Sequence, residues 1–236
     1  MTGDRATSSH DGRRHALLAI DTATTRVVVA TGTPDGIADG ITTWAAGYRH
    51  GETLLATIGR FLGEQNIRRS RLVGIVVGTG PGAFTGLRVG IATAKGLAHG
   101  LGIPLVGVST AQALLAAARS IPGAGESVLL LPAGPSDRIL VRREASPVLV
   151  PGGQEPELGP TETLVALDLD GRAPADALEL GEVARAGLGA ELVRQGAARL
   201  RAGDTDDLAR LVPDYVTLPR GVRELSGEVA WSHSPR

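Results

Sequence analysis

The segment GTGPGAFTGLRVGIATAKGLAHGLGIP, residues 78–104, decides the fold because a glycine-rich loop in it joins a strand to a helix. The strand before it, within residues 71–80, is short and nearly all apolar, as buried parallel strands are. A helix is expected over residues 85–99, closed by Gly100. The stretch IPLVGVST, residues 103–110, predicts another strand leading into a further helix. This alternation favours an α/β fold with parallel strands.

The residues upstream predict an antiparallel meander followed by a helix. LLAIDTATTRVVVATG, residues 17–32, indicates two strands around a threonine-rich turn, and a third strand is expected near residues 41–44. Residues 52–64 predict an amphipathic helix, because apolar side chains recur there at spacings of three and four. Those side chains are Leu54, Leu55, Ile58, Phe61 and Leu62. The expected order of the first half is therefore βββαβαβα.

The second half has a weaker pattern. Strands are expected at residues 127–131 and 138–142, a Pro/Gly loop at 150–159 and a long helix at 179–201. Strands followed by a helix echo the first half, although no sequence repeat is visible.

This pattern divides the chain into four parts. We expect a disordered leader at residues 1–14, an N-terminal lobe at 15–115, a smaller second lobe at 116–212, and a C-terminal segment and tail at 213–236.

Composition excludes several classes of protein. The 236 residues include no cysteine, which rules out a disulfide framework and a thiolate metal site and fits a cytoplasmic protein. The 24 basic and 25 acidic side chains nearly cancel, so no global field would hold nucleic acid. No apolar run approaches the ~20 residues that a membrane span needs.

Two loops are candidates for binding an anion. The glycine-rich loop would expose backbone N–H groups at a helix N-terminus, and the turn at residues 21–25 lies where actin-like ATPases place a phosphate loop. A tight structural turn is the alternative, because Ala23 replaces the expected glycine and the second half offers no matching Asp-x-Gly. The candidate residues are Asp21, Thr22, Thr24, Gly80 and Gly82.

The predicted helix 85–99 carries a stripe of small side chains at i, i+4 spacing, formed by Gly86, Gly90, Ala94 and Ala98. Such a stripe permits close packing, either against a helix of another subunit or against the chain's own sheet.

The sequence predicts no catalytic residue and no metal held by the protein. Residues 107–111 resemble a nucleophile elbow but end in alanine, and only His233 follows, so Ser109 or Thr110 is interpreted as a helix N-cap. The histidines form no spaced cluster, and the glycine of residues 168–171 comes too early for a calcium loop.

Several motifs resemble one bacterial family. GPGAFTGLRVGIATAKGLAHGLGIPLVGVSTAQAL, residues 80–114, is similar to the YeaZ-like (TsaB) family of tRNA threonylcarbamoyladenosine biosynthesis proteins. Residues 17–30 and 49–55 agree in order and spacing, and Pro213-x-Tyr215 resembles a late family motif. Residues 131–140 depart from the family's usual strand pair.

The resemblance implies a two-lobed actin-like (ASKHA, RNase H-like) α/β fold with mixed sheets. It also implies a non-catalytic scaffold that supports threonylcarbamoyl transfer to the adenosine beside the tRNA anticodon, binding the catalytic TsaD and the ATPase TsaE. The chain would hold no cofactor itself, with ATP or ADP only at the complex interface, and would meet tRNA through the complex. A homodimer in isolation stays open.

The resemblance places the partner interface on helices of the first lobe, with candidates Leu54, Leu55, Ile58, Phe61, Leu62, Gly86, Gly90, Ala94 and Ala98. Two alternative functions are an independent actin-like ATPase or kinase and a peptidase.

Overall fold

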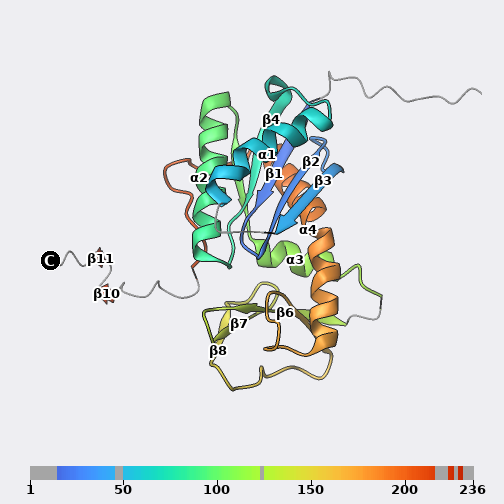
Figure 1. Cartoon of the computed structure of the whole chain (residues 1–236), viewed down its shortest axis with the longest axis vertical. Coiled ribbons are helices and arrows are strands. Elements are labelled where there is room, and N and C mark those ends of the chain that lie inside the picture. Colours follow the sequence, from blue (N-terminus) through green and yellow to red (C-terminus); the bar gives the residue numbers. More distant parts are fainter. Residues whose placement is uncertain (1–14, 46–49, 123–124, 216–222, 226–227, 231–236) are drawn as a thin grey trace, which may run out of the picture.

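The computed structural model describes residues 15–45, 50–122, 125–215, 223–225 and 228–230. Its main body consists of two sheets with helices packed on them (Figure 1). The predicted leader at residues 1–14 lies outside the described residues, as does most of the predicted tail.

The first sheet has the strand order β3-β2-β1-β4-β5. β1 pairs antiparallel with β2, and β2 pairs antiparallel with β3, while β4 is parallel to both β1 and β5. The strands are β1 Ala16–Asp21, β2 Arg26–Gly32, β3 Ala38–Ala45, β4 Leu72–Gly78 and β5 Leu105–Val108. The predicted meander and the order βββαβαβα are confirmed.

Helices cover both faces of this sheet. α1 (His50–Glu64) and α2 (Phe84–Leu101) pack on one face with Leu18 and Ile20 of β1. α3 (Thr110–Ala118) and α4 (Ala175–Arg201) pack on the opposite face with Ala19. Because successive side chains of a strand point to opposite faces, β1 contributes to both cores.

The second sheet has the order β8-β7-β6-β9, with β6 antiparallel to β7 and parallel to β9. Its strands are β6 Glu126–Pro132, β7 Arg138–Val141, β8 Val148–Val150 and β9 Glu162–Ala166. β6 and β7 confirm the two predicted strands, whereas β8 and β9 were not predicted.

The other short elements are a 3-10 turn η1 (Arg69–Arg71) and a hairpin of β10 (Arg223–Leu225) and β11 (Glu228–Ala230). Among the described residues, no helix is long and apolar enough to cross a membrane.

The sequence predicts a cap at the end of α2 and another at the start of α3. Gly100 does not close α2; the helix continues to Leu101, and Gly102 closes it with a left-handed φ of 64°. The N–H of Gly102 reaches the carbonyls of the last turn, an arrangement that glycine favours because it lacks a Cβ. Ser109 caps α3 as predicted, its side chain accepting a hydrogen bond from the N–H of Gln112.

Candidate functional site

The small-residue stripe of α2 faces the chain's own fold. Gly86, Gly90, Ala94 and Ala98 are all buried. A Cβ added at Gly86 would lie 2.1 Å from the carbonyl oxygen of Thr22, and one at Gly90 would lie 2.2 Å from the Thr22 hydroxyl. Of the two alternatives left open for this stripe, the burial favours packing within the chain: Gly86 and Gly90 lie against the turn after β1. Ala94 and Ala98 belong to the core beneath α1 and α2.

Replacing Ala94 with leucine is expected to destabilise the fold by about 1–3 kcal/mol, because extra methylenes must enter a filled core. The matched control is Ala92→Leu on the exposed side of α2, which should change stability by less than about 0.5 kcal/mol. Urea unfolding measures both variants. Equal stability of the two would contradict the buried position of Ala94.

The predicted interface residues of α1 are mostly buried as well. Leu54, Ile58, Phe61 and Leu62 belong to the core beneath α1 and α2, so their assignment to a partner interface is wrong. Leu55 differs, with 53% of its surface exposed. It is the predicted interface residue that the structure leaves available.

A second small-residue stripe lies on the outward side of the helix pair. Ala92, Gly96 and Gly100 of α2 are exposed, again at i, i+4 spacing. A Cβ built at Gly96 or at Gly63 of α1 would meet nothing within 4 Å. We call Leu55, Gly63, Ala92, Gly96 and Gly100 the outer helix face. Sequence reasoning missed this second stripe, although large apolar residues beside the first one, Leu87 and Ile91, indicated which stripe is buried.

The turn after β1 holds a fully buried carboxylate. Asp21 accepts hydrogen bonds from the N–H of Ala23 (2.9 Å) and from the hydroxyl of Thr110 (2.6 Å). Thr110 in turn accepts the N–H of Gly80 at 3.1 Å. Burial raises the pKa of Asp21 to about 6, and the two hydrogen bonds and the charge of Arg185 offset this only in part. Because it has no exposed surface, Asp21 cannot contact a ligand in this state.

The glycine-rich loop packs directly on the same turn. The N–H of Ala83 donates to the carbonyl of Ala23 at 2.7 Å, and a Cβ added at Gly82 would lie 2.2 Å from that oxygen. The hydroxyls of Thr22 and Thr24 donate to backbone carbonyls. The structure thus brings the five predicted anion-binding residues together, but as an interlocked structural turn, and the anion-loop prediction is corrected accordingly.

A buried ion pair, which the sequence did not predict, joins this turn to the second sheet. Asp168, after β9, accepts hydrogen bonds from the N–H (2.8 Å) and the hydroxyl (2.5 Å) of Thr25. Arg185 of α4 donates to the same carboxylate at 2.7 Å, and both side chains are more than nine-tenths buried. The Asp168 carboxylate therefore occupies the turn at residues 21–25, which the sequence offered as a phosphate-binding loop.

The residues of the Pro-x-Tyr motif lie against the N-terminus of α2. Asp214 accepts a hydrogen bond from the Thr79 hydroxyl at 2.5 Å, and burial raises its pKa. Tyr215 accepts a hydrogen bond from Arg88, whose guanidinium stacks over Phe84. Asp214 and Tyr215, at the start of the expected C-terminal segment, are therefore held against Thr79 and α2.

Comparisons with known proteins agree with these motifs. The family model described as "TsaD: tRNA N6-adenosine threonylcarbamoyltransferase" matches residues 35–149. The protein named tRNA threonylcarbamoyladenosine biosynthesis protein TsaB from Escherichia coli is 36% identical over 94 residues, covering 40% of this chain and 40% of that protein. The solved structure titled "YeaZ from Pseudomonas aeruginosa" superposes with a TM-score of 0.65 at 22% identity, covering 86% of this chain and all of that one.

The chain is therefore similar to TsaB in sequence and to YeaZ in fold. Its two mixed sheets with covering helices form the actin-like, RNase H-like α/β fold. An uncharacterised protein of Mycobacterium leprae is 41% identical over 103 residues, covering 42% of this chain and 28% of that protein. The chain thus spans less than half the length of these curated relatives.

Proposed function

We propose that this chain takes part in tRNA threonylcarbamoyladenosine biosynthesis as a non-catalytic subunit that binds a TsaD-like catalytic protein. The similarity to TsaB over 94 residues and the match of the TsaD family model to residues 35–149 support the pathway. The outer helix face is the observation that carries the binding role, since it combines an exposed leucine with small residues that allow another helix to approach closely.

The absence of a reacting group is part of the same proposal. Among the described residues, no group of three or more His, Asp or Glu side chains could hold a metal ion. Asp21 is enclosed, and the Thr25 donors are occupied by Asp168. These contacts argue against an independent actin-like ATPase, which needs an open phosphate loop at this turn. We propose that a TsaE-like ATPase joins the assembly, and that nucleotide and tRNA are bound by the complex.

Leu55→Asp is the sharpest test of the outer helix face. The charge should weaken association with the TsaD-like protein of the same organism by at least about tenfold, because burying an unpaired carboxylate in an interface is costly. The fold should survive, since Leu55 is 53% exposed. Co-purification and titration calorimetry measure the effect.

Val183→Asp on α4 is the matched control, because Val183 is 55% exposed and lies away from α1 and α2. It should bind like the wild type. Equal binding by Leu55→Asp and the wild type would remove the outer helix face from the proposal.

Reconstitution tests the activity itself. The chain alone should neither modify tRNA nor hydrolyse ATP, whereas adding it to matching TsaD-like, TsaE-like and adenylate-forming proteins should restore modification, measured by nucleoside mass spectrometry. ATP hydrolysis by the chain alone, abolished by Asp21→Ala, would favour the ATPase alternative instead.

A further inference from the structure

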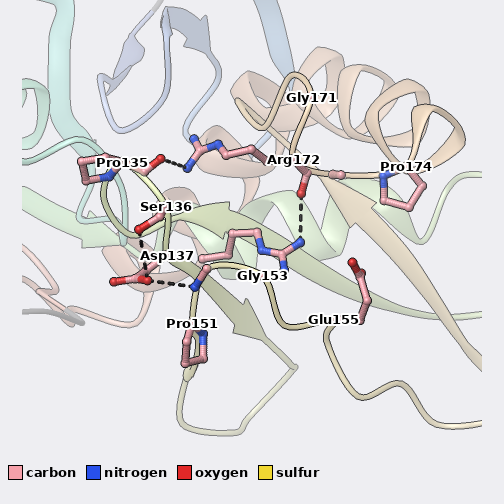
Figure 2. Close-up of a pocket in the computed structure, with 12 residues that line it drawn as sticks. Pro135, Ser136, Asp137, Pro151, Gly153, Glu155, Gly171, Arg172 and Pro174 are labelled. Carbon is pink, nitrogen blue, oxygen red and sulfur yellow. Dashed lines mark hydrogen bonds between the residues drawn. The ribbon is translucent and has the colours of Figure 1, made fainter.

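An open cavity of about 940 Å³ lies at one end of the second sheet. Its walls are the loop between β6 and β7, the loop after β8, and residues 171–174 at the start of α4 (Figure 2). A volume of this size is within the range of metabolite pockets, ~300–1,000 Å³. The cavity includes part of the segment, residues 131–140, that departs from the family's usual sequence.

Two arginines face this cavity. Arg138 of β7 is only 6% exposed, and its guanidinium donates to the carbonyl of Arg172 at 2.9 Å and to the carbonyl of Gln154. Arg172 donates to the carbonyls of Gly134 (3.0 Å) and Pro135 (3.1 Å). These bonds hold the three loops together around the cavity, and Figure 2 draws the one between Arg172 and Pro135.

Neither arginine has a carboxylate partner within the part of the chain that the structure describes. Backbone carbonyls satisfy some of their N–H groups but carry no formal charge, and a guanidinium has five N–H donors. A buried charge normally pairs with an opposite charge, because removing it from water is costly. Both arginines therefore line this cavity without a carboxylate at ion-pair distance among the described residues.

Two carboxylates of the cavity wall, Asp137 and Glu155, form no ion pair with either arginine in the described part of the chain. Asp137 accepts hydrogen bonds from the N–H of Gly152 at 3.0 Å and from the hydroxyl of Ser136 at 3.5 Å. Glu155 is an exposed residue of the same wall. Both carboxylates thus line the cavity, with Asp137 bonded to other residues of the wall.

We propose that this cavity binds a small anion, a phosphate- or carboxylate-bearing molecule, whose charge is balanced by Arg138 and Arg172. Planar guanidinium groups suit both anions because they present paired N–H donors to two oxygens at once. The site is separate from the outer helix face, and it does not depend on the proposed role in tRNA modification.

Titration of the full chain with inorganic phosphate and, in a second arm, with succinate tests the proposal. Arg172→Gln should weaken binding by about tenfold, the cost of losing one charge-assisted contact. Glu155→Gln should tighten binding a few-fold, because it removes a negative charge from the wall without touching the hydrogen bonds that hold the loops. Glu64→Gln on α1 makes the same charge change far from the cavity and should leave affinity unchanged.

Binding of either anion, with the affinities of the three variants changing as stated, supports the site. The anion that binds more tightly identifies the ligand class. The proposal is overturned if the wild type binds neither anion, or if Glu155→Gln and Glu64→Gln behave alike. The second outcome is decisive even if Arg172→Gln loosens the loops. Failure of either kind leaves the outer helix face untouched, because the partner is absent from the experiment.

Discussion

Replacing Asp168 with alanine should lower the free energy of unfolding by about 3–5 kcal/mol, measured by urea denaturation. The substitution leaves Arg185 buried without its closest anion and removes two hydrogen bonds to Thr25. Breaking a buried ion pair from one side typically has this cost. Glu182 also contacts Arg185, at 3.1 Å, but its side chain is 62% exposed and compensates only weakly.

Asp170→Ala is the control for this loss. Asp170 is exposed and only two residues away, so its removal should change stability by less than about 0.5 kcal/mol. The double variant Asp168→Leu with Arg185→Met should recover much of the loss, because apolar pairs of similar size often replace buried ion pairs well. If Asp168→Ala is as stable as Asp170→Ala, the two sheets are held together by other contacts.

Asp21 should make the protein less stable as the pH rises from about 4 to 6. Its pKa is raised from 3.8 to about 6 on folding, so in this window the folded state keeps a proton that the unfolded chain has lost. The contribution of Asp21 to the free energy of unfolding is fully present below its unfolded pKa, and it is lost as the pH rises through its folded pKa. At 1.36 kcal/mol per unit, the total is about 3 kcal/mol.

Asp21→Asn should abolish this dependence. Between pH 4.5 and 6.5 the difference in unfolding free energy between wild type and variant should change by about 2 kcal/mol, in favour of the variant at the higher pH. Glu162, whose pKa is lowered to about 2 by Arg142, titrates below this range and is common to both proteins. A difference that stays constant with pH would mean that Asp21 does not titrate in this window.

The elements with regular hydrophobic periods were predictable from sequence. The buried strands around residues 17–32 and 71–80 and the helices α1, α2 and α4 follow directly from their patterns. β9 was missed because its first three residues are only partly buried, and its short apolar run, residues 164–167, does not by itself distinguish a strand from a helix.

The candidate site was less predictable, because its contacts join distant parts of the chain. Thr25 and Asp168 are 143 residues apart in sequence, and no local pattern relates them. The i, i+4 stripe of α2 predicts a close approach but does not identify the neighbour, and the nearest neighbour is the turn at Thr22. The hydrogen bond from Arg138 to the carbonyl of Arg172 likewise depends on how three loops meet.

Helix α4 is long enough to pack against both sheets. Its 27 residues extend about 40 Å. Its first turns bury Ala177 in the core of the second sheet, and near its end Gly196 lies so close to Val76 of β4 that an added Cβ would be 2.2 Å away. Figure 1 shows α4 running from the second sheet to the first. A movement that opens the two lobes away from each other would have to bend α4 or separate it from one of the two sheets. One helix therefore connects the wall of the arginine cavity, beside which α4 begins, to the sheet beneath the outer helix face.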